Sequence, residues 1–183
     1  MNIIYILLGV VALVGLWLIY VYNRLVRLKM RSDEALSDID VQTKRRFDLI
    51  PNLIETVKGY MTHENEVLTK VTEARSKVAS GGDTLNRAES ENMLSSTLKT
   101  LFAVSENYPD LKANANFLDL QRELADTENK IQASRRFYNS VVMDLNTAIE
   151  TFPINFVSSV FGFFKKDFFK AENEEKENVQ VKF

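Results

Sequence analysis

The chain has 183 residues, which leaves room for one domain of ordinary size beside a membrane segment. It contains no cysteine, which excludes disulfides and thiolate metal sites, and its net charge of −2 gives no general attraction for nucleic acid. Six glycines and three prolines are few for a β-rich protein, whereas Leu, Ala, Glu, Lys and Asn are plentiful. This composition favours an all-α fold.

The N-terminal stretch from Ile3 to Tyr22 contains no charged side chain. As a helix it would be about 30 Å long, at about 1.5 Å per residue, which matches the apolar core of a bilayer. No Lys or Arg precedes the stretch and no small-residue cleavage site follows it, so an uncleaved anchor over residues 1–23 is favoured over a signal peptide. We expect a transmembrane helix that starts at Ile3, with Trp17 and Tyr22 near its interfacial end.

Four basic residues follow this stretch directly, and no basic side chain precedes it: Arg24, Arg27, Lys29 and Arg31. The positive-inside rule therefore predicts a single-pass protein of the cell membrane, with its N-terminus outside and its body in the cytoplasm. The helix is expected to continue from the membrane into this body without a break.

Periodic apolar residues predict four helices in the body, residues 24–152, at about 24–59, 62–79, 84–107 and 110–152. In the first of them, one apolar stripe comprises Phe47, Ile50, Ile54 and Val57. The basic run Lys44, Arg45 and Arg46 falls mostly off this stripe and is interpreted as a solvated face. Pro51 should bend the helix there or interrupt it.

The end of the first helix has two interpretations. Gly59 is a plausible stop and Thr62 a plausible N-cap for the next helix, but the apolar stripe could also continue to residue 80. The break is favoured, because a helix from 24 to 80 would be about 85 Å long and no later helix matches it. Further along the chain, Pro109 ends the third helix and Asp110 is expected to cap the last.

The last helix has the most regular pattern in the chain. One row repeats every seven residues, namely Phe117, Leu124, Ile131, Tyr138, Leu145 and Phe152. A companion row consists of Ala113, Leu120, Thr127, Ser134, Val141 and Ala148. Two such rows form a packing seam, which predicts an antiparallel up-and-down four-helix bundle rather than a long homo-oligomeric coiled coil.

The segment 153–170 is rich in Phe, and seven Phe lie between positions 152 and 169. We expect it either to pack on the end of the bundle or to form an interfacial helix over 154–164. Its candidate membrane or partner contacts are Phe156, Phe161, Phe163, Phe164, Lys165 and Lys166. The following tail, residues 171–183, is acidic at its start and is expected to be flexible and disordered.

Residues that could carry chemistry are few. His63 is the single histidine, so no zinc site with three protein ligands and no di-iron Glu-x-x-His pair is expected, and we predict neither a metal nor a cofactor. The pair Arg135-Arg136 could bind an anion, but a solvated helix face explains it without further assumptions. No catalytic residue is predicted.

Several segments resemble the signature of the LemA family. The first is Lys44-Arg45-Arg46-Phe47-Asp48-Leu49-Ile50-Pro51-Asn52-Leu53, preceded by Tyr22-Asn23-Arg24-Leu25-Val26. Others are Glu106-Asn107-Tyr108-Pro109-Asp110-Leu111-Lys112-Ala113, Arg135-Arg136-Phe137-Tyr138-Asn139, and an ending of Phe161-Gly162-Phe163, an acidic stretch and Val181-Lys182-Phe183. The resemblance implies a single-pass bacterial membrane protein with an all-helical body. It supplies no catalytic residues, and it implies that family members are often encoded near a membrane zinc metalloprotease.

These observations predict a membrane-anchored cytoplasmic helical bundle that acts by binding. The expected partners are membrane lipid, other membrane proteins (a membrane metalloprotease among them) and copies of the chain itself. Nucleic acid is not expected as a partner. Two alternatives stay open: a self-assembling membrane-associated scaffold, and an enzyme with a carboxylate or Arg site between helices. The enzyme would show a concave pocket that holds a titratable group with a strongly perturbed pKa.

Overall fold

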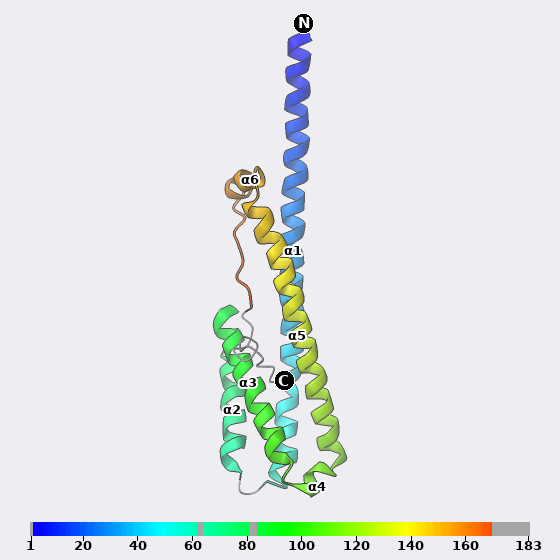
Figure 1. Ribbon diagram of the computed structural model, residues 1–183, viewed down its shortest axis with the longest axis vertical. Coiled ribbons are helices and arrows are strands. Elements are labelled where there is room, and N and C mark those ends of the chain that lie inside the picture. The colour runs from blue at the N-terminus through cyan, green and yellow to red at the C-terminus, as the bar shows by residue number, and fades with distance from the viewer. Residues whose placement is uncertain (1, 62–63, 81–83, 170–183) are drawn as a thin grey trace, which may run out of the picture. The chain divides into compact units, whose positions relative to one another are not determined.

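The computed structural model of the chain describes residues 2–61, 64–80 and 84–169 (Figure 1). These ranges contain six helices: α1 Asn2–Lys58, α2 Asn65–Ala79, α3 Thr84–Ser105, α4 Pro109–Lys112, α5 Ala115–Glu150 and α6 Ile154–Val160. No strand occurs within them, which confirms the all-α class. The predicted tail and its disorder, residues 171–183, lie outside the described part.

Helix α1 runs unbroken from the apolar N-terminal stretch to Lys58, as the sequence predicts. It is not interrupted at Pro51, where proline removes only a single backbone donor. The helix ends where the backbone N–H groups of Tyr60 and Met61 both donate to the carbonyl of Val57, each at 2.9 Å. The continuous helix to residue 80 is therefore wrong, and the break near Gly59 is confirmed.

The start of the last helix differs from the prediction. Pro109–Lys112 forms the separate short helix α4, and α5 begins only at Ala115. The cap is Asn114, whose Oδ1 accepts a hydrogen bond from the backbone N–H of Phe117 at 3.1 Å. Asn satisfies free N–H groups of a first helical turn as well as Asp does, so the predicted cap at Asp110 is wrong by one short turn.

The chain divides into two compact units. Among the described residues, the first comprises residues 2–37 with Arg136–Phe168, and the second comprises Asp38–Arg135 with Phe169. Helices α1 and α5 each contribute one part to each unit.

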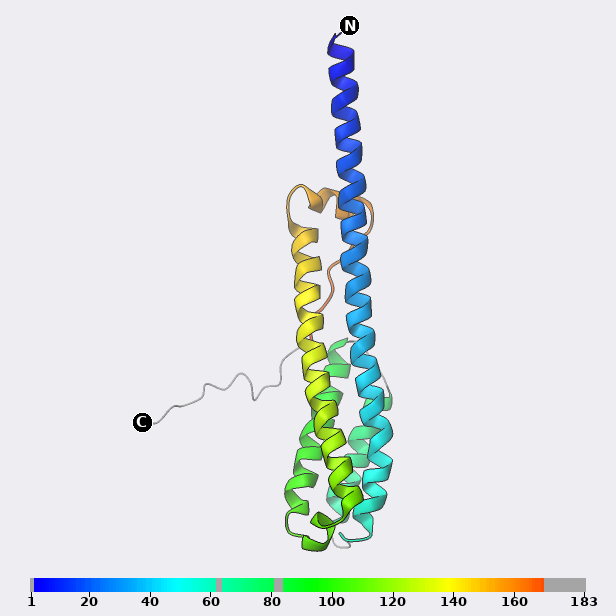
Figure 2. The same ribbon diagram turned by 90° about the vertical axis from the view of Figure 1, so that its right-hand side faces the viewer.

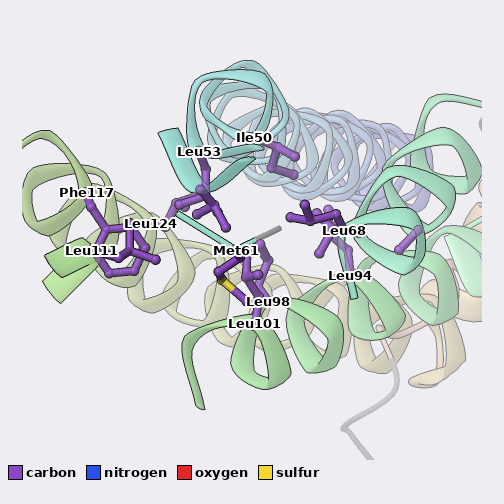
Figure 3. Packing of buried hydrophobic residues seen from close by; sticks show 13 residues of the cluster. Ile50, Leu53, Met61, Leu68, Leu94, Leu98, Leu101, Leu111, Phe117 and Leu124 are labelled. Carbon is purple, nitrogen blue, oxygen red and sulfur yellow. The ribbon is translucent and has the colours of Figure 1, made fainter. Parts of the chain in front are cut away.

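In the second unit, four long helices supply one apolar core (Figure 3). Its buried side chains include Ile50, Leu53 and Val57 of α1, Leu68 and Val71 of α2, Leu94, Leu98 and Leu101 of α3, and Phe117 and Leu124 of α5. The α1 stripe differs from the predicted one, because Leu53 is buried whereas Phe47 and Ile54 are only half-buried. Phe47 instead carries the guanidinium of Arg75 on its ring, 3.8 Å from the ring centroid.

The first unit has a smaller core. Val21 and Leu25 of α1 pack with Leu145, Ala148 and Ile149 of α5 and with Val157 of α6. The row of α5 that repeats every seven residues is buried from Phe117 to Leu145, as predicted. Phe152 is 74% exposed, because α5 ends at Glu150. The chain then turns back toward α1 through α6.

Truncating the α5 row provides the first prediction. Leu124→Ala and Ile131→Ala are each expected to lower the free energy of unfolding by about 2–5 kcal/mol, because each leaves a cavity at a buried position. Arg122→Ala is the control, since this side chain is 76% exposed. Urea unfolding of the chain in mild detergent, followed by helical circular dichroism, measures all three. Equal losses at the three positions would show that the seam has the wrong register.

Candidate functional site

The apolar stretch of α1 is exposed from Ile3 to Tyr20, and Val21 is the first of its side chains to be buried. Ile3, Leu8, Leu13 and Ile19 are each more than half exposed, and α1 is the one helix in the described ranges that is long and apolar enough to cross a membrane. Trp17 and Tyr22 are exposed by 37% and 40%. Exposed apolar side chains in such a continuous run are unfavourable in water, which makes this stretch the first candidate contact with lipid.

The chain after α5 is folded back and held by its own core contacts. Val157 and Ser158 of α6 are buried, and the Ser158 hydroxyl donates to the backbone carbonyl of Ile149 at 3.2 Å. At Gly162 the backbone has a φ of 71°, a left-handed conformation that glycine adopts without a steric penalty. Helix α6 therefore ends in a defined turn at Gly162.

Two side chains of α5 then fix the extended segment that follows. The Nδ2 of Asn146 donates to the carbonyl of Lys166, and its Oδ1 accepts from the N–H of Lys166, both at 2.9 Å. The hydroxyl of Tyr138 donates to the carbonyl of Asp167 at 3.1 Å. Burial, together with the charges of Asp167 and Asp33, raises the pKa of Tyr138, so the phenol stays protonated as this bond requires.

The turn after α6 contacts α1 where its apolar stretch ends, at the level of α1 that α6 reaches in Figure 2. The ring of Tyr22 meets the rings of Phe161 and Phe163 edge-on, with centroids 5.0 Å and 5.8 Å apart. Edge-to-face contacts of this kind are favourable beyond the area they bury. They place α6 and its flanks beside the last aromatic residues of the apolar stretch.

The large apolar side chains between residues 152 and 169, which include the predicted contacts Phe156, Phe161, Phe163 and Phe164, divide into two groups. Phe163 is half-buried and packs on the core of the first unit, and Phe169 is 3% exposed. The other side chains of α6 and its flanks are exposed by 54–81% and form what we call the Phe-rich surface: Phe152, Phe156, Val160, Phe161 and Phe164. Phe168 is exposed too, but it follows Asp167, which is bonded to Tyr138, and it is not part of this surface. Helix α6 covers only Ile154–Val160, so the expected helix over 154–164 is too long, because the turn at Gly162 ends it.

Lys165 and Lys166, two of the predicted contacts, are paired within the chain, and the third lysine of this region, Lys170, lies outside the described residues. Lys165 Nζ lies 2.6 Å from Glu150 Oε1, and Lys166 Nζ pairs with Asp33. Their charges are therefore partly offset locally, and the exposed cations of this unit close to Tyr22 are Arg24 and Arg27 of α1.

A second cluster, buried and ionic, lies in the second unit. Arg46 of α1 is 1% exposed, and its Nη1 lies 2.5 Å from Oε2 of Glu128 on α5. The same nitrogen donates to the Ser95 hydroxyl of α3 at 2.8 Å, and that hydroxyl lies 2.9 Å from Oε2 of Glu128. One guanidinium thus links three helices.

The carboxylate of Glu91 on α3 completes this cluster. It is fully buried, and Arg135 Nη2 donates to its Oε2 at 2.7 Å, while Arg87 Nε and Thr43 Oγ1 donate to its Oε1 at 3.0 and 3.2 Å. Arg87 also pairs with Asp40. Three arginines therefore face three carboxylates, which satisfies the requirement that buried charges be paired.

Two sequence-based interpretations are wrong here. Arg46 and Arg135 do not belong to solvated faces, because both side chains are largely buried and each is paired with a carboxylate of another helix. Burial removes the Arg46 guanidinium from water and lowers its pKa. The negative charges of Glu128 and Glu91 act in the opposite direction and raise the pKa of Arg46. Only Arg45 and Lys44 of the basic run are exposed.

A cavity of about 230 Å³ adjoins this cluster. Its lining includes the polar residues Arg46, Ser95 and Glu128 and the apolar residues Leu98, Phe102 and Leu124. A concave pocket beside a titratable group with a perturbed pKa is the feature that the enzyme alternative requires. However, the guanidinium and the carboxylate are bonded to each other, and a guanidinium does not exchange protons near neutral pH.

The described ranges hold no group of three or more His, Cys, Asp or Glu side chains arranged to bind a metal ion. His63, the single histidine, lies outside those ranges. The ionic cluster consists of arginines and carboxylates already joined by hydrogen bonds, so it offers structural links rather than free ligands.

Together, these features define an all-helical protein with a long apolar N-terminal helix and a helical body joined by buried ion pairs. The sequence profile of the LemA family matches residues 35–183. The chain is 31% identical to Protein LemA of Metamycoplasma hominis over 160 residues, which covers 87% of this chain and 73% of that protein. The chain belongs to the LemA family.

More distant relatives carry another name. The chain is 21% identical to Magnetosome protein MamQ 2 of Paramagnetospirillum magneticum over 177 residues, covering 82% of this chain and 65% of that protein. It is also 21% identical to Magnetosome protein MamQ of Magnetospirillum gryphiswaldense over 174 residues, covering 81% and 64%. The chain thus matches slightly less than two thirds of the length of these relatives.

Proposed function

We propose that the chain is a single-pass membrane protein whose body, an antiparallel up-and-down four-helix bundle, acts by binding rather than by catalysis. The observation that carries the proposal is the exposure of the apolar side chains from Ile3 to Tyr20 on one uninterrupted helix. A stretch of this length and composition is stable in a bilayer and unfavourable in water.

The state of the ionic cluster supports binding over catalysis. Arg46, Glu91, Glu128 and Arg135 are bonded across helices, so moving any of them toward a substrate would leave a buried charge unpaired. The proposed partners are membrane lipid, other membrane proteins such as a membrane metalloprotease, and further copies of the chain. Crosslinking in intact cells identifies the protein partners, and the size of the particle in mild detergent distinguishes a scaffold of many copies from a single-copy binder.

The orientation of the protein is the second prediction. Four basic residues follow the apolar stretch, so the N-terminus is expected outside and residues 24–183 in the cytoplasm. Protease added to intact spheroplasts should spare the body, and the same protease should digest it after lysis. Retention in membranes at alkaline pH tests the anchoring itself. Digestion of the body without lysis would contradict the orientation, and extraction at alkaline pH would contradict the anchor.

A further inference from the structure

We propose that the Phe-rich surface inserts into the interfacial layer of the same membrane that α1 enters, as a second contact with lipid. The inference rests on the proposed function, namely that the stretch from Ile3 to Tyr20 spans a bilayer. It adds a surface from the opposite part of the sequence, and it explains why large apolar side chains after α5 are left uncovered.

The first argument is that the backbone of this surface is fixed. Val157 and Ser158 hold α6 on the core of the first unit, and Asn146 and Tyr138 hold the segment that follows. The outward rings are therefore presented by an ordered backbone that has already buried its other side. Phe156 and Phe164 remain 65% and 81% exposed on it. Clustered exposure of this kind marks a surface that meets another apolar phase.

The second argument identifies the phase as lipid. Phe161 and Phe163 contact Tyr22, which belongs to the aromatic end of the apolar stretch together with Trp17 and Tyr20. The Phe-rich surface is thus continuous with the part of α1 that sits at the boundary of a bilayer, where aromatic rings are favoured. Exposed Arg24 and Arg27 follow on α1, as is typical of the headgroup level.

The pairing of the lysines sharpens the inference. Lys165 is paired with Glu150 and Lys166 with Asp33, so a carboxylate beside each lysine offsets part of its attraction to an anionic headgroup. Insertion should therefore depend on the rings and occur in zwitterionic lipid as well. Two contacts on one membrane would also fix the rotation of α1 about its axis, since interfacial anchors rather than span length set helix orientation.

The experiment uses the full chain, reconstituted into phosphatidylcholine vesicles. The chain has no cysteine and a single tryptophan, Trp17, so a fluorescent label can be attached to one introduced cysteine while Trp17 reports on the anchor. The label is placed by Phe156→Cys or by Phe164→Cys. The matched control is Phe137→Cys, another exposed Phe of the first unit, whose ring lies under Arg31 at 5.5 Å, nine residues beyond Tyr22.

Spin-labelled phosphatidylcholine with the nitroxide on the acyl chain then quenches whatever lies in the lipid. We expect quenching of Trp17 and of the label at positions 156 and 164, several-fold stronger than at 137. If the label at 156 and 164 is quenched no more than at 137, the surface does not enter lipid and the inference is overturned. The anchor is judged separately, because failure of the span leaves Trp17 unquenched.

Aqueous iodide distinguishes lipid from protein as the cover. A label inserted in lipid is shielded from iodide and reached by the nitroxide lipid. A label shielded from iodide but not reached by the nitroxide would mean that another copy of the chain covers the surface, and this result would also overturn the inference.

Discussion

Replacing Arg46 with alanine is expected to lower the free energy of unfolding by about 3–5 kcal/mol, the largest stability loss we predict for a single charged residue. The guanidinium is 1% exposed and bonds Glu128 at 2.5 Å and Ser95 at 2.8 Å. Its removal leaves the carboxylate of Glu128 without its cation and leaves an unfilled volume between three helices. Most of the loss in unfolding free energy comes from leaving the Glu128 carboxylate unpaired, and less of it from losing the attraction between the two side chains.

Arg45→Ala is the matched control, because Arg45 is the preceding residue and its Nη2 lies at the same distance, 2.5 Å, from Glu123. Both of these side chains are nearly half exposed, so this pair should contribute less than about 1 kcal/mol. Urea unfolding of both variants in the same detergent measures the difference. Losses of similar size would show that burial does not distinguish the two ion pairs.

Removing both partners provides an independent check. The double variant Arg46→Met with Glu128→Leu is expected to be more stable than Arg46→Met alone, since apolar side chains of similar volume can replace a buried ion pair without stranding a charge. This outcome would support a structural role for the cluster. If the double variant is less stable than Arg46→Met alone, a polar side chain is required at position 128, where the residue also lines the cavity.

Periodicity predicted the helices well because their buried faces are dominated by apolar residues. The row from Phe117 to Leu145 is buried, and α1 ends at Lys58, next to the predicted stop at Gly59. The cap at Asn114 was missed because Asp110 is an equally good capping residue one turn earlier. The local sequence does not distinguish between these two capping residues, since tertiary packing decides which turn belongs to the long helix.

The buried arginines could not be predicted from charge alone, because a basic run on a helix is ordinarily solvated. A signal was nevertheless present in the register of α1. The buried positions Ile39, Thr43, Arg46, Ile50 and Leu53 are spaced by three or four residues, so Arg46 continues the stripe toward the N-terminus. A polar residue in register with an apolar stripe indicates a buried partner, but that partner, Glu128, lies 82 residues away in the sequence.

The Phe-rich segment shows a different limit. Composition indicated that seven Phe are too many for a solvated tail, but it did not divide them between the core and the surface. That division depends on Asn146 and Tyr138, which hold the backbone from α5, and on the turn at Gly162. One side of the segment packs on the first unit, and the membrane contact of its exposed side stays a prediction.

Charges introduced into the apolar stretch should have the largest effect on the whole chain. The double variant Val11→Lys with Val14→Lys places two ammonium groups at the centre of the proposed span, where each costs about 2.5–3.5 kcal/mol on the insertion scale. We expect most of this variant to be lost from membranes at alkaline pH, conditions that also remove proteins bound only through a surface such as the Phe-rich one.

The control keeps the chemistry and changes the position. Met30 and Val41 are exposed apolar residues of the same helix, by 60% and 59%, and Val11 is exposed by 60%. Met30→Lys with Val41→Lys therefore adds the same charges to α1 beyond the proposed span and should leave membrane retention unchanged. Equal retention of both double variants would mean that the stretch from Ile3 to Tyr20 does not anchor the chain, and equal loss would mean that added charge, rather than its place in the bilayer, causes the release.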